Sequence, residues 1–508
     1  MMEALILEHL QNGPVKIRPH QEEHIVKLIQ ILQRSLCYLD TSAMGLGKTY
    51  ITIAVAMYYQ IKLLVVGPKI SEGVWNKAVE ASGANMVAFI TKDALRSRGN
   101  RQPKHGYLER WHDGKKTQFA VTKKFKRFVE DGGFLVIDEG HHMRNNSAQH
   151  RAAATLTNYI ATQESCRSRF AILTATPTSA IDQTINISRL MGFLTADKLL
   201  GRSRDGSKVL DGLQELIDVC SALDEDATSY ILSENRYYND KIAKDTAVKL
   251  FNDIIVAYMS SAAKPALLSI EVDRKNGYYN LDPKNRANFL SSLGNLEIAS
   301  KYDRTTKAIN QKIDLGVHKK RYNVMTERRK IEMMKVPIFH RLARATLEEN
   351  KNHKVIIGVH FIDTLNLLTE SLRDYNPIVL QGSVAGRDRE LLVEQFQANP
   401  KKRLIIAIMS VMSESISLHD TVGDMPRFKF FSPSFDLLQM YQACGRAVRD
   451  GDSTKSDVTI RFVYVKEGEL ERHIYDALAN KSRILKGALI CKTGVVLPSD
   501  FEDFIEED

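Results

Sequence analysis

The stretch SAMGLGKTY at residues 42–50 ends in Gly-Lys-Thr, which is typical of a phosphate-binding loop. Gly45 and Gly47 let backbone N–H groups close around phosphate oxygens, and a following helix adds its positive N-terminal end. Lys48 then reaches the β- and γ-phosphates, and the Thr49 hydroxyl binds Mg²⁺. A serine stands where the strict GxxxxGK[ST] pattern has its first glycine, so the loop alone predicts a nucleotide and no particular reaction.

A pair of carboxylates follows the apolar run GFLVI, which begins at residue 133. Asp138 stands where a second Mg²⁺-coordinating carboxylate is needed, and Glu139 beside it can orient and deprotonate an attacking water. His141 is either a relay between sites or an ordinary loop histidine, whereas His142 is interpreted as structural.

Two further groups of residues can act with this pair. Thr174, Ala175 and Thr176 end the next apolar run, and their two hydroxyls can bond both the acidic pair and a neighbouring domain. Arg446 and Arg449 in YQACGRAVRDG are three residues apart, so on a helix they share a face. Two guanidiniums there can stabilise a transferring γ-phosphate, which predicts that ATP lies between two domains.

Apolar strands must position these residues. Short apolar runs alternate with helical patterns, as in a parallel sheet with helices on both faces, and ligands then bind at the carboxyl ends of the strands. Strands are predicted at 35–40, 62–68, 133–139, 169–177, 354–361, 403–410, 427–434 and 457–465. Helices are predicted at 48–60, 388–397 and 469–485, and Ser71 is expected to cap a helix that carries Trp75.

The order of these patterns predicts two α/β domains with a helical region between them. From about 195 to 345 the chain is helical, charged and poor in strands, with VDRKNGYYNLDPKN as an interruption. The predicted boundaries are 1–195 for the first domain, 196–345 for the helical insertion and connector, 346–485 for the second domain, and 486–508 for an extension with an acidic tail.

Composition bounds the remaining possibilities. The 508 residues are 44% hydrophobic and 26% charged, as in a globular protein of two or three domains. The five cysteines form no CxxC pair, which disfavours a zinc ribbon or a disulfide framework. The N-terminus lacks a basic segment and the apolar runs are too short for a bilayer, so we expect an intracellular, soluble protein without a membrane partner. The net charge of +10, concentrated at 96–128 and 318–330, favours nucleic acid.

In order and content the motifs resemble the superfamily 2 nucleic-acid-dependent ATPases, most of all the Snf2-like branch. The similar segments cover roughly 15–195 and 335–485. They are IRPHQEEHI, MGLGKT, LLVVGPKISEGVWNKAVE, DEGHHMRNNSAQ, LTATPTS, QGSVAGRDRELLVEQFQ and FFSPSFDLLQMYQACGRAVRDG. The resemblance implies two tandem RecA-like domains that use ATP and Mg²⁺.

The resemblance also implies roles for individual residues. Gln21 reads adenine, Gln442 contributes to the nucleotide site, and Glu414 couples ATP to nucleic acid together with His141 and the Thr174–Thr176 segment. The loop contacts to nucleotide come from Met44, Gly45, Leu46, Gly47, Lys48 and Thr49, and the nucleic-acid contacts come from Pro68, Lys69, Gln381, Gly382, Ser383 and Ser410.

The sequence departs from the family pattern in three places. Gly140 replaces the usual alanine of the DEAH motif, and MSVMSESISLHD (409–420) stands where the family has a glycine-rich turn followed by Asn-Leu. Val448 stands where the family often has histidine. The second change falls on the segment to which the coupling role of Glu414 is assigned.

Three functions follow as hypotheses. The first is an ATP-driven translocase on nucleic acid, most of all double-stranded DNA, with transcription, repair or replication proteins as partners. The second is an RNA or single-strand helicase, against which the sparse aromatics Tyr107, Trp111 and Phe125 count. The third is a weakly active or non-catalytic adaptor for a transcription or packaging complex, for which Lys48 and Glu139 would have no use.

Overall fold

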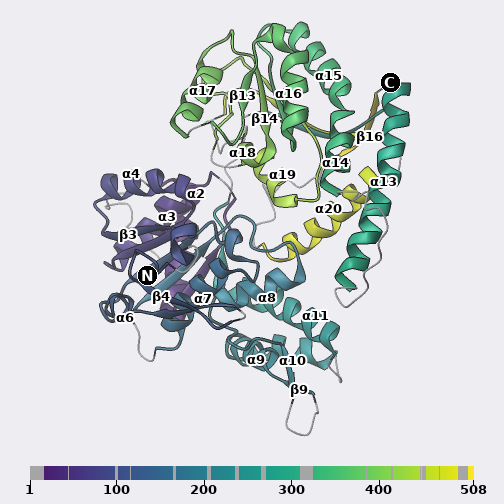
Figure 1. Ribbon diagram of the computed structural model, residues 1–508. Coiled ribbons are helices and arrows are strands. Elements are labelled where there is room, and N and C mark those ends of the chain that lie inside the picture. The colour runs from purple at the N-terminus through teal and green to yellow at the C-terminus, as the bar shows by residue number, and fades with distance from the viewer. Residues whose placement is uncertain are drawn as a thin grey trace. The chain divides into compact units, whose positions relative to one another are not determined.

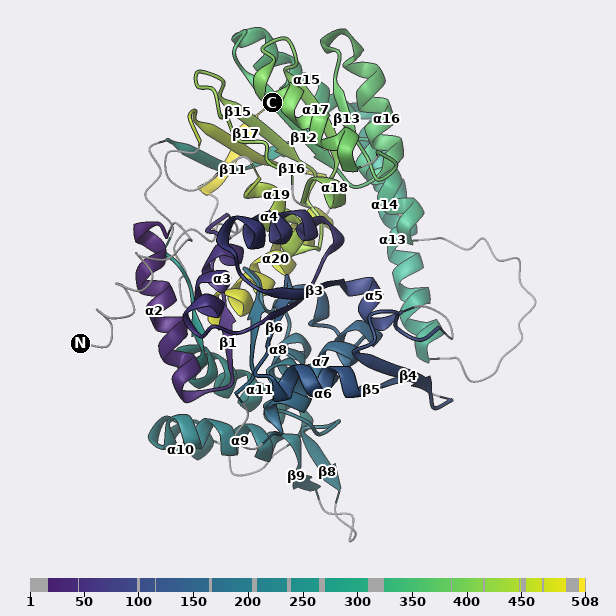
Figure 2. The same ribbon diagram turned by 90° about the vertical axis from the view of Figure 1, so that its left-hand side faces the viewer.

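The protein, seen in a computed structural model, folds into two compact units (Figures 1 and 2). Unit 1 consists of residues 1–266 with 483–495, and unit 2 consists of residues 267–482 with 496–508. The domain boundaries given above stay predictions. The structure describes residues 17–43, 45–97, 101–114, 116–163, 167–202, 208–234, 239–264, 270–308, 324–384, 386–413, 416–446, 448, 454–467, 470–489 and 502–507.

The sheet of unit 1 has six strands within the described residues, in the order β10-β1-β7-β6-β2-β3, and all neighbours are parallel. Apart from Arg169 at the start of β7, its central strands are buried along their whole length, which explains their nearly continuous apolar sequences. The carboxyl ends of β1 and β6 therefore lie at the same edge of the sheet. The strands are β1 (Cys37–Asp40), β2 (Leu63–Gly67), β3 (Met86–Thr91), β6 (Phe134–Asp138), β7 (Arg169–Leu173) and β10 (Ser260–Ser261).

Helices pack around this sheet, and three of them form a separate group beside α8, labelled α9, α10 and α11 in Figure 1. Two antiparallel hairpins, β4–β5 and β8–β9, stand apart from the main sheet. The elements are α2 (Pro19–Arg34), α3 (Lys48–Tyr58), η1 (Lys69–Ser71), α4 (Glu72–Ser82), α5 (Lys92–Arg96), β4 (Leu108–His112), β5 (Thr117–Val121), α6 (Lys123–Glu130), η2 (Gly140–Met143), α7 (Ala148–Ala161), α8 (Ile181–Leu190), β8 (Leu200–Arg202), β9 (Lys208–Leu210), α9 (Gly212–Leu223), α10 (Glu225–Ser233), α11 (Asp240–Leu250), η3 (Phe251–Ile255) and α12 (Val256–Met259).

Unit 2 contains a second parallel sheet, in the order β13-β14-β12-β15-β16-β11-β17. Helices α15 and α16 pack against β12, and α17 packs against β13. The strands are β11 (Val272–Tyr279), β12 (Lys354–Val359), β13 (Ile378–Leu380), β14 (Leu404–Ile408), β15 (Arg427–Phe431), β16 (Val458–Val465) and β17 (Glu502–Glu507), and the helices are α13 (Pro283–Ala308), α14 (Val324–Met333), α15 (Val336–Glu349), α16 (Ile362–Ser371), η4 (Arg373–Tyr375), α17 (Gly386–Ala398), α18 (Met409–Ser413), α19 (Leu437–Cys444) and α20 (Leu470–Gly487).

The predicted α/β class is confirmed, since each unit contains a parallel sheet flanked by helices. The stretch VDRKNGYYNLDPKN does interrupt the helical region, because its first eight residues form β11, which lies between β16 and β17 in the second sheet. Pairing with a strand nearly two hundred residues later decides this, and the Tyr278 ring stacks on the Tyr464 ring at 5.1 Å between centroids.

Candidate functional site

The phosphate loop follows β1 and has the backbone that its glycines predict. Gly45 and Gly47 have φ of 86° and 81°, in the left-handed region that favours glycine. Lys48 is the first residue of α3, and its Nζ donates to the carbonyls of Ser42 (3.0 Å) and Ala43 (3.2 Å). The lysine therefore holds the loop in a curved form around its own ammonium group.

Gln21 of α2 lies directly against this loop. Its side chain is buried, and Nε2 donates to the Leu46 carbonyl at 2.9 Å. A Cβ on Gly47 would lie 2.5 Å from Nε2 of Gln21, so glycine there is required by both the backbone and its neighbour. Sequence reasoning placed Gln21 near the nucleotide, and the structure brings it to the loop; its reading of adenine stays a prediction.

A buried polar network supports the loop from beneath and explains the serine in the first glycine position. The Ser42 hydroxyl lies 3.2 Å from Nε2 of His24 and accepts from the Ala263 N–H at 2.8 Å. Nδ1 of His24 contacts the Ser261 hydroxyl at 2.8 Å, and its Nε2 lies 3.2 Å from Asp40. Burial opposes charge on Asp40, but His24 and Lys48 together hold the pKa of that carboxyl below its usual range.

Asp138 ends β6 and is almost fully buried. Its Oδ2 accepts from the indole N–H of Trp75 at 2.9 Å, and the Ser71 hydroxyl is a further hydrogen-bonding partner. Burial, followed by the charge of Glu139, raises the pKa of Asp138 to about 6, although Trp75, Ser71 and Lys48 all oppose that rise. A buried carboxylate held by donors yet short of positive charge is suited to a divalent cation.

Glu139 adopts φ 50° and ψ 52°, a left-handed conformation that is uncommon for a residue with a side chain. This turn directs the chain into η2 and brings Oε2 of Glu139 to 3.2 Å from Nδ1 of His141. The His141 ring lies 4.2 Å from that of His142, whose Nδ1 is 3.2 Å from Nζ of Lys92. Burial, then His141 and Lys92, lower the pKa of His142 to about 3, so this ring stays neutral and accepts from Lys92.

The Thr174–Thr176 segment follows β7, between β1 and β6 in the sheet. All three residues are buried, and the Thr174 N–H donates to the Asp40 carbonyl at 2.9 Å. The Thr174 hydroxyl accepts from the Thr176 N–H at 3.1 Å, which fixes a tight turn. The segment is thus tied to the end of β1, and its predicted coupling role is not tested.

In unit 2 the expected helix ends earlier than predicted. Helix α19 ends at Cys444 with Gly445 as its cap, so the expectation that Arg446 lies on a helix is wrong. Buried Lys429 accounts for this end, because its Nζ donates to the carbonyls of Ala443 (2.7 Å) and Cys444 (2.9 Å). Gln442, within α19, is half-buried.

Arg446 holds the atypical segment 409–420. Its guanidinium donates to the Ser413 carbonyl through Nε (3.1 Å) and Nη2, and its own carbonyl accepts from the Leu418 N–H at 2.7 Å. The Leu418 carbonyl in turn accepts from Nε of Arg427 at 3.1 Å. Two arginines therefore hold Ser413 and Leu418 of this segment.

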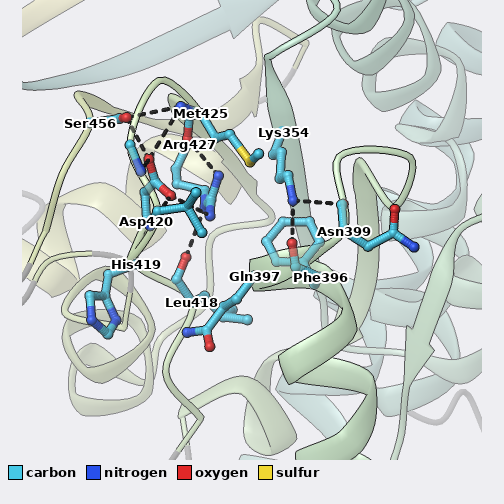
Figure 3. Close-up of polar contacts among 12 residues, drawn as sticks. Lys354, Phe396, Gln397, Asn399, Leu418, His419, Asp420, Met425, Arg427 and Ser456 are labelled. Carbon is cyan, nitrogen blue, oxygen red and sulfur yellow. Dashed lines mark hydrogen bonds and ion pairs between the residues drawn. The ribbon is translucent and has the colours of Figure 1, made fainter.

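Arg427 belongs to a buried charged cluster, shown in Figure 3. It pairs with Asp420 (3.4 Å), which also accepts the N–H groups of Val422 and Gly423, each at 3.1 Å. Burial opposes charge on Asp420, yet its hydroxyl donor Ser456, then Arg427, hold the pKa of its carboxyl below the usual range. The side chains of both Asp420 and Arg427 are completely inaccessible to solvent.

The predicted nucleic-acid contacts are mostly at the surface. In unit 1, Lys69 is 80% exposed and pairs with Glu72, and Pro68 precedes it at the start of η1. In unit 2, Gly382, Ser383 and Ser410 are exposed and Gln381 is half-buried. Met44, Glu414 and Arg449, together with residues 318–323 of the second basic run, lie outside the described residues.

Sequence reasoning missed the residues that hold the site in place. Ser71 occupies the cap position of α4 without making the expected cap bond; its hydroxyl donates to the Pro68 carbonyl at 3.0 Å, and it also contacts Asp138. Trp75, which lies in the segment LLVVGPKISEGVWNKAVE, donates to Asp138. A tryptophan amid polar residues was the available signal, since a buried indole N–H needs an acceptor.

Comparison with known proteins shows which helicases and ATPases this chain is similar to. Residues 336–451 match the family model described as Helicase conserved C-terminal domain. The putative ATP-dependent RNA helicase L364 of Acanthamoeba polyphaga mimivirus is 25% identical over 508 residues, covering 93% of this chain and 84% of that protein. The chromatin-remodeling ATPase INO80 of Candida glabrata is 29% identical over 158 residues, covering 30% of this chain and 10% of that protein.

These matches support the resemblance to the Snf2-like branch of superfamily 2. Similarity to helicases and to a chromatin-remodeling ATPase also supports the prediction that the chain is an enzyme, a nucleic-acid-dependent ATPase. Among solved structures, the Sulfolobus solfataricus SWI2/SNF2 ATPase core in complex with dsDNA aligns with 95% of this chain and 98% of that one, with 13% identity and a TM-score of 0.31. In the part of the chain that the structure describes, no helix is long and apolar enough to cross a membrane.

Proposed function

We propose that the protein is an ATP-driven motor that translocates along double-stranded DNA. The observation that carries the proposal is the grouping of Lys48, Asp138 and Glu139 at one edge of the unit 1 sheet, where the charge of Lys48 acts on Asp138. The preference for a duplex rests on the Snf2-like form of MGLGKT and DEGHHMRNNS.

The nucleotide site in this proposal is the loop at residues 44–49. Lys48 exchanges its bonds to the Ser42 and Ala43 carbonyls for phosphate oxygens, and Gln21 contacts the adenine. Thr49 and Asp138 would hold Mg²⁺, which neutralises phosphate charge when bound. The raised pKa of Asp138 supports this assignment, because a nearby cation would favour the ionised carboxylate.

Glu139 orients the attacking water and accepts its proton. The short contact with His141 fixes the carboxylate, and the neutral His142 ring packs against His141. Arg446, Arg449 and Gln442 of unit 2 complete the site by stabilising charge on the γ-phosphate. For Arg446 this requires leaving the Ser413 carbonyl, so the segment 409–420 would respond to ATP.

Nucleic acid is held through its phosphates. Lys69 and Pro68 in unit 1, and Gln381, Gly382, Ser383 and Ser410 in unit 2, are the proposed contacts, with coupling through His141, Glu414 and the Thr174–Thr176 segment. Binding should then depend little on sequence and fall steeply with salt.

The test is the ATPase rate without nucleic acid and with duplex DNA, single-stranded DNA or RNA, at several salt concentrations. We expect duplex DNA to stimulate most and the stimulation to fall as salt rises. Equal rates with and without duplex at every salt concentration would refute the proposal. Triplex displacement without duplex unwinding would distinguish translocation from strand separation.

An RNA or single-strand helicase is the second candidate. Two observations favour it: the printed name of the mimivirus relative, and the exposure of Trp111, which is 50% accessible to solvent. Stronger stimulation by RNA or single-stranded DNA than by duplex, together with unwinding, would make this the better account.

A further inference from the structure

The hairpin β4–β5 is an insertion between α5 and α6, outside the six-stranded sheet. Its turn is held by the side chain of Asp113, which accepts from the Lys116 N–H (2.7 Å) and from Nε2 of Gln118 (2.7 Å). From α7, Nε of Arg151 donates to the Thr117 carbonyl at 3.0 Å. These hydrogen bonds hold the hairpin in place, and Figure 2 shows it beside α5, α6 and α7.

The two faces of this hairpin differ. Leu108 and Phe119 are buried, and β5 packs against α7. Trp111 pairs with Gln118 across the strands, so the alternation of side chains places it on the face opposite Leu108. Trp111 is 50% exposed, whereas Trp75, the other tryptophan of the chain, is fully buried. An indole left in water on a rigid element is available to a ligand.

The surroundings of Trp111 are basic. Residues 101–131 contain nine lysines and arginines against four acidic residues, a surplus of five within a chain of net charge +10. The Gln102 side chain donates to the Arg110 carbonyl (2.7 Å) and accepts from its N–H (2.9 Å), which ties the segment carrying exposed Arg101 to β4. Lys116, beyond the turn, is exposed as well.

We propose that Trp111 stacks on an unpaired base of single-stranded nucleic acid, while cations of residues 101–127 contact the neighbouring phosphates. Charge complementarity favours a polyanion over a protein partner. Stacking on the flat indole face requires a base that is not already stacked inside a duplex, which selects a single strand. The inference rests on the proposed function, in which the chain moves on nucleic acid, and adds a contact that duplex tracking does not use.

Fluorescence of the full chain provides the test. Acrylamide reaches exposed Trp111 and not buried Trp75, so quenching reports on Trp111 alone in the unmodified protein. We expect a twenty-nucleotide oligo(dT) to reduce acrylamide quenching about twofold, and relaxed circular duplex DNA to leave it nearly unchanged. Equal protection by circular duplex would overturn the single-strand assignment. Unchanged quenching with every nucleic acid would overturn the inference and leave a protein partner as the account of the exposed indole.

Matched variants measure the contribution of stacking. Trp111→Ala should weaken oligo(dT) binding roughly 5- to 100-fold, and Trp111→Phe less than about threefold because the smaller ring still stacks. The control Tyr230→Ala removes an aromatic that is 71% exposed on α10 and should change nothing. Unaltered oligo(dT) binding by Trp111→Ala would overturn the inference.

Failure of this inference differs from failure of the proposed function. If duplex DNA stimulates ATP hydrolysis but no nucleic acid protects Trp111 from acrylamide, only the proposed stacking contact is refuted. If no nucleic acid stimulates ATP hydrolysis by the unmodified protein, the proposed motor function is refuted, whatever the fluorescence shows.

Discussion

The two sheets bury their charges at opposite ends of their strands. In unit 1, Asp40 and Asp138 are the last residues of β1 and β6. In unit 2, Lys354 and Arg427 are the first residues of β12 and β15. Ligands bind at the carboxyl ends of parallel strands, so only the unit 1 charges lie where chemistry is expected.

One buried carboxylate from each unit, Asp420 and Asp138, shows how differently a buried charge can be satisfied. Around Arg427, Figure 3 shows the carboxylate of Asp420 surrounded by donors, and the pKa of that carboxyl is lowered. At the other site the pKa of Asp138 is raised to about 6. A buried charge with complete partners stabilises structure, whereas one short of positive charge marks a place for a ligand.

Replacing Glu139, the proposed catalytic base, should have the largest effect on ATP hydrolysis. Glu139→Gln should lower kcat at least ~100-fold, because an amide cannot accept the proton of the attacking water. ATP binding and the midpoint of urea unfolding should change little, since Glu139 is partly exposed. Steady-state ATPase assays, nucleotide titration and urea unfolding would measure the three quantities. Substantial hydrolysis by this variant would contradict the assignment of chemistry to the unit 1 edge.

The matching change in unit 2 should affect stability first. Arg427→Met should lower the free energy of unfolding by about 3–5 kcal/mol, because it leaves Asp420 buried without its cation. Urea unfolding measures this loss. Adding Asp420→Asn should recover part of it, since the amide oxygen still accepts backbone N–H groups while the unpaired charge is gone. Recovery of none of the loss by the double variant would show that lost packing, and not charge, is responsible.

Asp138 should make the stability of the protein depend on pH. Its pKa is raised from 3.8 to about 6, so its contribution to stability is fully present below pH 3.8 and is lost as pH rises through 6. The expected loss is on the order of 2–3 kcal/mol. Unfolding of the wild-type chain in EDTA from pH 4 to 7 should show it, and Asp138→Asn should abolish that part of the slope. A parallel slope in the variant would assign the effect to other groups.

The smallest predicted effect concerns the departure from the DEAH pattern. A Cβ on Gly140 would lie 2.6 Å from Cγ2 of Ile172 in β7, so Gly140→Ala should cost about 1–2 kcal/mol of stability. Ile172→Leu, which removes that methyl branch, should relieve the loss. Gly73 in α4 has open space around it, and Gly73→Ala should be neutral or stabilising by up to ~1 kcal/mol. Thermal unfolding of the four variants, with the double mutant included, tests the packing.

Much of unit 1 was predictable because its chemistry is local in sequence. The glycines of the loop, Lys48 at the helix start and Asp138 at a strand end follow from short patterns that specify one backbone each. The sequence shows that the 409–420 segment departs from the family pattern, but it does not show which contacts hold the segment in place of the glycines. Arg446 and Arg427 bind its carbonyls from positions whose distance depends on the folded sheet.

The sequence by itself determined the alternation of strands and helices, the glycine-containing loop after β1 and the order of the motifs, since each depends on neighbouring residues. Only the tertiary structure decided that β11 joins the second sheet, that Trp75 holds Asp138, and that Trp111 is exposed while Tyr107 and Phe125 are buried. These outcomes depend on contacts between residues far apart in the chain, and burial is a property of the packed molecule that no local pattern carries.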